Sequence, residues 1–445
     1  MSRPHFNTYT DFAIHLNALG LFHINPSLGA VERVIHALAL ARPPFATLQV
    51  VGTNGKGSTS TFLASLCKAH GLSTGLFTSP HFLSPRERIL VNGSMLEEHQ
   101  WLRYANVVMA AGGKELTYFE ILTVLALVAF QDMGVQVAVL EAGLGGTWDA
   151  TTATSADMLV VTPISLDHMA VLGNTVQEIA RDKAGAVRSP APVVCAIQER
   201  AVDAIFAEAA RKHGASYSVS QPSLPASMPL RPRLAGNFQR ANMALALHAF
   251  SVLSQHMPPL PGLGPVRLSE ANILLGLEKA WIPGRMQQAS SRLCLQDTPD
   301  FPHKTGWPPF ILDGAHNAAG LTSLGLSLAR EQLSPSAIIF ACLEDKEPEI
   351  MASHLRTLPP VPIFIPPVTE NSRAMEPVSL ASLVGLNATA CTSLEEALVL
   401  ASSSRAERLP EHAIPDCTDF PVLVCGSLYL LADFYTLRPD CLEAE

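Results

Sequence analysis

The sequence has few charged residues, and the acidic ones outnumber the basic ones. Charged residues make up 16% of its 445 positions, and 30 Lys and Arg against 39 Asp and Glu give a formal net charge of −9. Such a chain has no overall attraction for the phosphate backbone of a nucleic acid or for an anionic membrane. We therefore expect neither as a partner, and any phosphate site must be local.

Cysteine patterns and long apolar runs are also lacking. The eight cysteines occur singly, without C-x-x-C spacing, so we expect free thiols that lie mostly in the core. The longest apolar run covers residues 121–130, whereas a membrane-spanning helix needs roughly 20 residues. The first ten residues contain no apolar signal core. These absences predict a soluble, cytoplasmic protein.

Apolar residues are plentiful, at 48% of the chain, and they follow two similar patterns. From residue 47 to 211, short apolar runs alternate with helix-length stretches, which is typical of a parallel sheet covered by helices on both faces. A second series starts at residue 310. Between them, 298–309 contains four prolines in twelve residues and favours an extended connector. We predict an α/β domain of residues 1–297, a linker of 298–309 and a smaller α/β domain of 310–445.

Residues 52–58 read GTNGKGS and stand between a strand-like run and a helix-like stretch. Glycines let successive backbone N–H groups point at phosphate oxygens, and the helix N-terminus adds partial positive charge. Lys56 would bind the β- and γ-phosphates, and Ser58 or Thr59 would offer a hydroxyl to Mg²⁺. The spacing differs from GxxxxGK[ST] by an extra glycine after the lysine. A turn that binds nothing is the alternative, but the flanking strand and helix favour a phosphate loop.

Ser79, Glu141 and His168 each come at or just after the end of an apolar, strand-like run. Ligands bind at this edge of open α/β sheets, and Glu141 is well placed as a magnesium ligand because a buried carboxylate needs a charged partner. Ser79 as a turn hydroxyl and His168 as an ordinary hydrogen-bonded histidine are the alternatives. Lys183 lies in the helix-like stretch 175–187, where a solvated surface lysine is the default interpretation.

The chain resembles the folylpolyglutamate synthase and dihydrofolate synthase family, within the Mur-type ATP-dependent amide ligases. The matching strings occur in the family's order: GTNGKGS (52–58), TSPHFLSPRERI (78–89), TYFE (117–120), LEAGLGG (140–146), WDAT (148–151), SLDHMAVLG (165–173), QEIARDKAG (177–185), LAGNFQRANMALAL (234–247), PGRMQ (283–287) and DGAHN (313–317).

The resemblance implies an N-terminal P-loop ATPase domain with a mostly parallel sheet, a smaller C-terminal Rossmann-like domain that binds glutamate, and an active site between them. It implies ATP binding by twelve residues, namely Gly52, Thr53, Asn54, Gly55, Lys56, Gly57, Ser58, Thr59, Asn242, Arg285, Asp313 and His316.

Two magnesium ions are implied by the same resemblance. Their ligands would be Ser58, Ser79, Glu141, His168 and Lys183. Lys183 matches the lysine that the family carbamylates with CO₂, which turns a cation into a carboxylate analogue. Lys56, His168 and Lys183 are therefore the expected catalytic residues.

The pterin substrate is implied to contact Thr117, Tyr118, Phe119, Glu120, Trp148 and Asp149, with the loop near 27–29 as a further wall. TYFE also fits a plain helix start with a threonine cap and an acidic first turn. The family usually carries arginine after GLGG and asparagine after DAT, whereas this chain has Thr147 and Thr152. Both departures lie near the expected pterin pocket.

The implied activity is an ATP-dependent ligase that joins L-glutamate to dihydropteroate, to the terminal glutamate of folates, or to both. A carboxylate is a poor electrophile, so ATP must first convert it to an acyl phosphate. Small-molecule substrates and a monomer are expected.

Other functions are a Mur-type ligase of cell-wall precursors, a P-loop regulatory ATPase or a non-enzymatic carrier. Only 51 residues precede Gly52, too few for the UDP-binding domain expected of the cell-wall enzymes. TYFE also favours a pterin substrate, and the expected metal ligands argue against a carrier.

Overall fold

The structure of the protein is a computed structural model. It describes residues 5–20, 26–224, 228–256, 266–289 and 307–442, apart from 357, 359, 370, 386, 407 and 409–419. The chain divides into two compact units, one of residues 1–232 and 241–280 and the other of residues 233–240 and 281–445. None of the described helices combines the length and the apolar character needed to cross a membrane.

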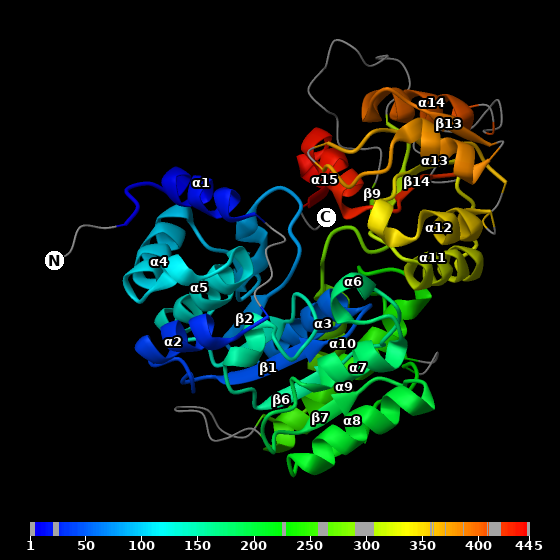
Figure 1. Ribbon diagram of the computed structural model, residues 1–445. Coiled ribbons are helices and arrows are strands. Elements are labelled where there is room, and N and C mark those ends of the chain that lie inside the picture. The colour runs from blue at the N-terminus through cyan, green and yellow to red at the C-terminus, as the bar shows by residue number, and fades with distance from the viewer. Residues whose placement is uncertain are drawn as a thin grey trace. The chain divides into compact units, whose positions relative to one another are not determined.

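The first unit contains a sheet with the strand order β4-β3-β2-β5-β1-β6-β7-β8. Figure 1 labels strands β2, β1, β6 and β7 of this sheet. Strands β2, β5, β1, β6, β7 and β8 run parallel, and β3 and β4 continue the sheet antiparallel. The strands are β1 (Ala46–Val51), β2 (Thr74–Phe77), β3 (Ile89–Val91), β4 (Ser94–Met95), β5 (Val137–Glu141), β6 (Met158–Val161), β7 (Val193–Cys195) and β8 (Tyr217–Val219).

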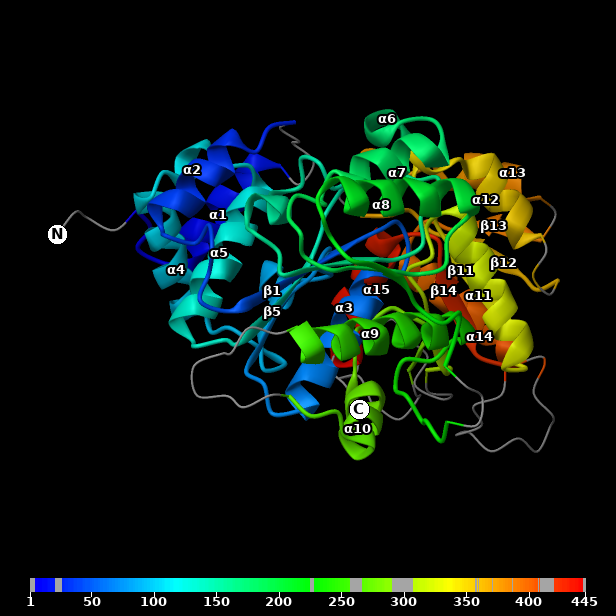
Figure 2. The ribbon, with the colours of Figure 1, turned by 90° about the horizontal axis from the view of Figure 1, so that it is seen from below.

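Helices cover both faces of this sheet (Figure 2). One face carries α1 (Tyr9–Leu19), α2 (Gly29–Ala37), α4 (Glu98–Ala110), α5 (Tyr118–Asp132), α7 (Val176–Ala184) and α8 (Arg200–Lys212), and the other carries α3 (Lys56–Ala69), α9 (Asn237–His256) and α10 (Glu270–Lys279). Every residue of β1, β5 and β6 is buried. Burial on both faces explains why these strands read as continuous apolar runs.

The second unit contains a smaller sheet with the order β13-β12-β11-β14-β10-β9. Its strands are β9 (Gln287–Ala289), β10 (Phe310–Leu312), β11 (Ala337–Phe340), β12 (Ile363–Ile365), β13 (Ala388–Ala390) and β14 (Val422–Cys425), all parallel except β9. Its helices are α11 (Ala318–Arg330), α12 (Pro348–Leu355), α13 (Pro377–Val384), α14 (Leu394–Ala406) and α15 (Leu428–Leu437). Helices α11, α12 and α13 pack on one face, and Phe310 contacts Phe434 of α15 on the other.

The α/β fold class that the sequence predicted is confirmed, including the larger, mostly parallel sheet and the second, smaller one. The linker predicted at 298–309 stays a prediction, because residues 298–306 lie outside the described residues. Strand β9 precedes that linker but pairs with β10 of the second sheet. Six of the eight cysteines are described, and all six are buried free thiols, as expected.

Candidate active site

The phosphate loop joins β1 to α3 at the carboxyl edge of the first sheet. Strand β1 ends at Val51, and α3 begins at Lys56 with Gly55 as its N-cap. The motif therefore has the buried strand and the helix on its two sides that its interpretation requires. Because the first backbone N–H groups of a helix have no partner within it, this end of α3 can bind an anion.

Two glycines of the loop are required by close approaches. Gly52 has a φ of +149°, and a Cβ at that position would collide with Oγ1 of Thr162. Gly55 has a φ of +84°, and its Cβ would lie 2.5 Å from Oδ1 of Asn242 in α9. Only glycine accepts this backbone and this space. Asn242, a member of the expected nucleotide-binding set, thus lies beside the loop.

The segment after β6 holds the phosphate loop in place. The backbone N–H of Thr53 donates to the carbonyl oxygen of Pro163 at 3.0 Å, and its hydroxyl donates to the carbonyl oxygen of Ser165 at 3.1 Å. The amide of Asn54 donates to Oγ of Ser165 at 3.1 Å. Nζ of Lys56 donates to the carbonyl oxygen of Thr53 at 3.2 Å, so the lysine folds back over the loop.

Ser58 and Thr59 follow in the first turn of α3, and both are buried. The hydroxyl of Thr59 is buried without a hydrogen-bond partner among the residues that the structure describes. A buried polar atom of this kind costs free energy unless something satisfies it. An unsatisfied hydroxyl close to a helix N-terminus fits a ligand with oxygen atoms.

Glu141 and Ser79 lie together at the ends of β5 and β2, the next two strands after β1 in the sheet. Glu141 ends β5 and is buried, while Ser79 follows β2, the neighbouring parallel strand. The backbone N–H of Ser79 donates to Oε2 of Glu141 at 3.0 Å. The structure thus brings two of the expected magnesium ligands into contact at the carboxyl edge of the sheet.

Lys183 is buried and reaches the phosphate loop, so it is not the surface lysine that its helix position suggested. Its side chain is 3% exposed, and Nζ donates to the carbonyl oxygen of Gly52 at 2.8 Å. Burial, and after it the charge of Lys56, lower the pKa of Lys183 to about 7, although carboxylates including Asp182 act in the opposite direction. A lysine in this environment has a substantial neutral fraction near neutral pH.

His168 has the strained backbone and the exposure of a residue at a loop tip. It caps the short helix α6 (Met169–Leu172) with a φ of +50°, and its side chain is 45% exposed. Nε2 lies 3.9 Å from Oδ1 of Asp167, whose carboxylate is buried. Asp167 was given no role from the sequence, yet its charge is among those that act on Lys183.

The TYFE segment forms the N-terminus of α5, as its plain interpretation predicted. The backbone N–H of Thr117 donates to Oε2 of Glu120 at 2.7 Å. Tyr118 and Glu120 are buried, and the ring of Phe119 lies 5.4 Å from that of Phe77. The capping role is therefore present, and a role in substrate binding stays a prediction.

Arg88 is a buried residue to which the sequence interpretation gave no role. Its Nε donates to Nδ1 of His81 at 2.7 Å, and its guanidinium lies 5.5 Å from the ring centroid of Tyr118. Burial, and after it the charge of Arg88, lower the pKa of His81 to about 3. A charged residue directly before an apolar strand was the available signal, because a buried cation needs partners.

Trp148 and Asp149 stand next to each other but have opposite environments. Trp148 is 51% exposed. Asp149 is buried, and its carboxylate accepts from the backbone N–H of Leu144 at 2.9 Å and from the backbone N–H and hydroxyl of Thr151. Burial raises the pKa of Asp149. The carboxylate thus holds its own loop together, and contact with a pterin stays a prediction.

Thr147 and Thr152, the two departures from the family pattern, both make internal hydrogen bonds. The hydroxyl of Thr147 donates to the carbonyl oxygen of Asp182 at 2.7 Å. The hydroxyl of Thr152 donates to the carbonyl oxygen of Gly146 at 2.7 Å and accepts from Nε2 of Gln49 at 2.7 Å. Their side chains therefore support the glycine-rich loop after β5, residues 142–147.

Arg285, Asp313 and His316 form a separate group in the second unit. Asp313 follows β10 and accepts from the backbone N–H of Met286 and of Ala315, both at 2.8 Å. Burial raises the pKa of Asp313, and the charge of Arg285 opposes this. Nδ1 of His316 lies 2.8 Å from the carbonyl oxygen of Gly314. The structure brings these three residues together.

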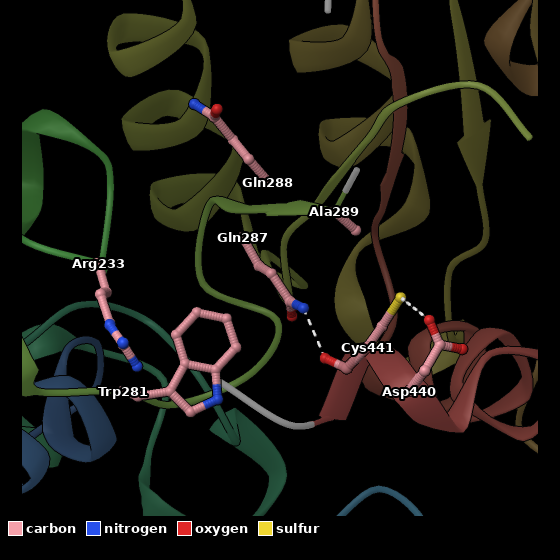
Figure 3. A pocket seen from close by; sticks show the side chains of 7 residues that line it. All are labelled: Arg233, Trp281, Gln287, Gln288, Ala289, Asp440 and Cys441. Atoms are coloured by element: carbon pink, nitrogen blue, oxygen red, sulfur yellow. Dashed lines mark hydrogen bonds between the residues drawn. The ribbon is translucent and has the colours of Figure 1, made fainter. Parts of the chain in front are cut away.

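A pocket of the second unit lies beside β9 and contains none of the expected site residues (Figure 3). Its lining includes Trp281, whose indole nitrogen is buried without a partner in the described part of the chain. Nε2 of Gln287 donates to the carbonyl oxygen of Cys441 at 2.6 Å, and its Oε1 accepts from the hydroxyl of Tyr435 at 2.7 Å. The polar groups of Gln287 are thus used within the fold.

Within the described ranges, no group of three or more His, Cys, Asp or Glu side chains could hold a metal ion. The expected magnesium set contains only one carboxylate, Glu141, besides hydroxyls, His168 and Lys183. Magnesium is usually bound through one or two carboxylates together with waters and substrate phosphates. A small number of protein ligands therefore fits a magnesium ion whose other ligands are waters and substrate phosphates. These side chains alone would not complete its coordination.

The chain is similar to known proteins in sequence and in structure. Residues 50–224 match the model of the Mur ligase middle domain. The dihydrofolate synthase/folylpolyglutamate synthase of Bacillus subtilis is 31% identical over 382 residues, which cover 79% of this chain and 84% of that protein.

Solved structures agree over nearly the full length. Escherichia coli FolC, solved in complex with DHPP and ADP, has a TM-score of 0.78 at 27% identity, covering 97% of this chain and 98% of that chain. The bifunctional folylpolyglutamate synthase/dihydrofolate synthase of Yersinia pestis, solved with AMPPNP and a Mn ion, has a TM-score of 0.77 at 28% identity, with the same coverage.

Proposed function

Because this chain belongs to the folylpolyglutamate synthase and dihydrofolate synthase family, we propose that it joins L-glutamate to dihydropteroate, to the terminal glutamate of a folate, or to both. It is an ATP-dependent, amide-forming ligase. Within the site, the strongest support is Lys183, a buried lysine that donates to the phosphate loop in the same unit as Lys56 and the Glu141–Ser79 pair.

ATP would bind to the residues that the family motifs name. The backbone of 52–59 and the side chain of Lys56 would hold the phosphates, since a glycine loop at a helix N-terminus suits an anion. Asn242 lies against Gly55 and would extend this surface. Arg285, Asp313 and His316, which lie together in the second unit, are the remaining proposed nucleotide contacts.

The residues present fit magnesium, because a buried carboxylate lies beside Ser79 and oxygen atoms dominate the set. Ser58, Ser79, Glu141, His168 and a modified Lys183 would hold two ions. Bound there, magnesium supplies charge neutralisation on the transferring phosphate oxygens. The Mn ion in the Yersinia pestis structure supports a divalent cation in this family.

Lys183 would carry a CO₂-derived carbamate. Its neutral amine nitrogen would bond to the carbon of CO₂, and one N–H proton would leave to solvent. Burial, the nearby Lys56 and the resulting low pKa favour the neutral amine that this step needs. The product is an anion, which would attract the Lys56 ammonium group and would not repel metal ions.

The reaction would proceed in two displacements. A carboxylate oxygen of the pterin acid would attack the γ-phosphorus of ATP, and ADP would leave with the bridging oxygen and its electron pair. Lys56 would stabilise the charge that spreads over the transferring oxygens. The amine of L-glutamate would then attack the acyl carbon of the acyl phosphate, phosphate would leave, and the extra amine proton would pass to solvent.

The pterin would lie against the start of α5 and the glycine-rich loop, near Thr117–Glu120, Trp148 and Asp149, with 27–29 as a further wall. Exposed Trp148 and half-buried Phe119 offer aromatic surface, which suits a flat heterocycle. Glutamate would bind to the second unit. The protein would act in the cytoplasm as a monomer on small molecules, without nucleic acid or membrane partners, in keeping with its net charge of −9.

The decisive experiment offers purified protein Mg-ATP and L-glutamate with either dihydropteroate or tetrahydrofolate, and resolves products by mass. We expect one glutamyl increment on the pterin acid and ADP release that requires both the acid and glutamate. ADP release that needs neither would support a regulatory ATPase instead. Activity on only one acid would assign the substrate.

A further inference from the structure

The glycine-rich loop after β5 is bonded directly to the C-terminal turn of α7. The backbone N–H of Gly146 donates to Oδ1 of Asp182 at 2.9 Å. The backbone N–H and the hydroxyl of Thr147 both donate to the carbonyl oxygen of Asp182, at 3.0 and 2.7 Å. Asp182 therefore receives three hydrogen bonds from two consecutive loop residues.

The glycine-rich loop and α7 are packed so closely that neither can shift along the other. A Cβ at Gly146 would collide with the carbonyl oxygen of Lys183, and a Cβ at Gly185 would collide with Oγ1 of Thr147. The loop and the helix thus meet backbone to backbone. A displacement of one must move the other, since close-packed atoms leave no space to take up the change.

The loop itself is anchored from the other side. The hydroxyl of Thr152 donates to the carbonyl oxygen of Gly146, and Gln49 of β1 donates to Thr152. Lys183 is consequently held at both ends. Its backbone lies against the glycine-rich loop, and its Nζ donates to the carbonyl oxygen of Gly52 in the phosphate loop at 2.8 Å.

We propose that Thr147 and Asp182 are positioning residues for Lys183, which they hold at the phosphate loop through the bonds between the glycine-rich loop and α7. This inference rests on the proposed function only in that Lys183 takes part in ligation. Thr147 stands where the family usually has arginine, so this chain uses a short hydroxyl bond to its own backbone at that position. A displacement of about 1 Å at a reacting group lowers the rate of reaction.

The first test compares hydroxyl removal with hydroxyl retention at Thr147. Thr147→Val keeps the shape and the backbone bond but removes the hydroxyl bond, and we expect kcat to fall roughly 3- to 10-fold, the value of one hydrogen bond, with the KM for ATP within about twofold. Thr147→Ser should restore kcat. The control is Thr154→Val, which removes a buried hydroxyl bonded to Leu40 and should leave kcat unchanged at a similar Tm.

Asp182 provides a second pair of variants. Asp182→Ala removes the acceptor for Gly146, whereas Asp182→Asn keeps an oxygen at that position. We expect the alanine variant to lose more kcat than the asparagine variant. Equal losses in the two variants would show that the hydrogen-bond acceptor is not what Asp182 contributes, and would overturn its positioning role.

A double-mutant cycle separates positioning of Lys183 from general support of the fold. In a Lys183→Ala background, with activity partly restored by added acetate, Thr147→Val should have no further effect on kcat. If the two losses multiply instead, Thr147 acts independently of Lys183 and the positioning proposal is overturned, while the ligase function stands.

A readout without turnover distinguishes the remaining outcomes. With ¹³C-labelled bicarbonate, the wild-type protein should show a carbamate NMR signal that Thr147→Val weakens and Lys183→Ala abolishes. A wild-type protein that adds no glutamate overturns the proposed function, and the NMR signal then still tests positioning. A wild-type protein that shows neither glutamate addition nor the signal overturns both.

Discussion

Arg88 donates from Nε to Nδ1 of His81 across 2.7 Å, so the imidazole accepts at Nδ1 and carries its proton on Nε2. The same guanidinium lies over the ring of Tyr118 at 5.5 Å. One buried cation thus connects the TSPH segment after β2 with the start of α5. These two segments come from the strings 78–89 and 117–120, which are separate in the sequence, and both belong to the expected site.

Replacing Arg88 should damage both stability and substrate binding. Arg88→Met keeps most of the side-chain length but removes the hydrogen bond to His81 and the contact between cation and ring. We expect about 2–3 kcal/mol less free energy of unfolding and a higher KM for the pterin acid. The control is Arg103→Met, because Arg103 pairs with Asp132 and lies over the ring of Tyr104 but has an exposed side chain. Urea unfolding would contradict the expectation if both variants lost equally.

Lys56 should be required for turnover but not for folding. Lys56→Ala removes the charge next to the phosphate loop, and we expect kcat for glutamate addition to fall by roughly 100-fold or more. Lys68→Ala is the control, because Lys68 lies at the other end of the same helix and its Nζ donates to the carbonyl oxygen of Asn92 at 2.6 Å. Full glutamate addition by Lys56→Ala would refute the nucleotide assignment.

Gly52 should not tolerate a side chain. Gly52→Ala places a methyl group against Thr162 and also strains a backbone with a φ of +149°, so we expect a loss of about 3 kcal/mol or more. Gly134→Ala isolates the strain, since Gly134 has a φ of +64° and open space around it, and should cost about 1–2 kcal/mol. Thermal unfolding of both variants measures the difference, and similar Tm values would exclude the predicted collision.

The pair of Arg438 and Asp440 should contribute stability that depends on pH. Arg438 is fully buried, and its Nη2 donates to Oδ2 of Asp440 at 2.7 Å. This hydrogen bond lowers the pKa of Asp440. A carboxyl group with a lowered pKa stabilises the folded state above its unfolded pKa, and this contribution is lost as pH falls through the folded pKa.

We expect Asp440→Asn to cost about 2 kcal/mol at pH 7, because it leaves a buried cation without its anion. The difference from wild type should shrink below about pH 4, near the ordinary pKa of an aspartate. Asp345→Asn is the matched control, since its partner Arg373 is partly exposed, and should cost less than about 1 kcal/mol. Urea unfolding at pH 7 and pH 3 checks both. A difference that does not change with pH would exclude the ion pair as its cause.

The central strands could be predicted, and the edge strands could not. β1, β5, β6 and β7 coincide with apolar runs that the sequence shows plainly, because strands buried on both faces are apolar throughout. β8 and β13, by contrast, have no fully buried residue, and they are three residues long. Such strands are defined by pairing with a neighbour, which leaves little trace in the local sequence.

The candidate site shows the same division. The phosphate loop could be predicted from the sequence because its glycines and its lysine are neighbours in the chain. The local sequence predicted that Lys183 is a surface lysine on a helix. The packing of α7 against the phosphate loop buries it instead. The local sequence did not show that the hydroxyls of Thr147 and Thr152 bond to the protein's own backbone, and their place near a substrate stays a prediction. A local sequence pattern does not predict which backbone group a side-chain hydroxyl will bond to.

The amino-acid order alone determined the α/β class, the glycine loop and its helix, and the family motifs, because each depends on residues that are neighbours in the chain. Tertiary structure alone decided which distant groups meet: Glu141 with Ser79, Arg88 with His81, and Lys183 with Gly52. The reason is physical. Parallel strands bring their carboxyl ends to one edge whatever their order in the chain, and burial there changes the charge that each group can carry.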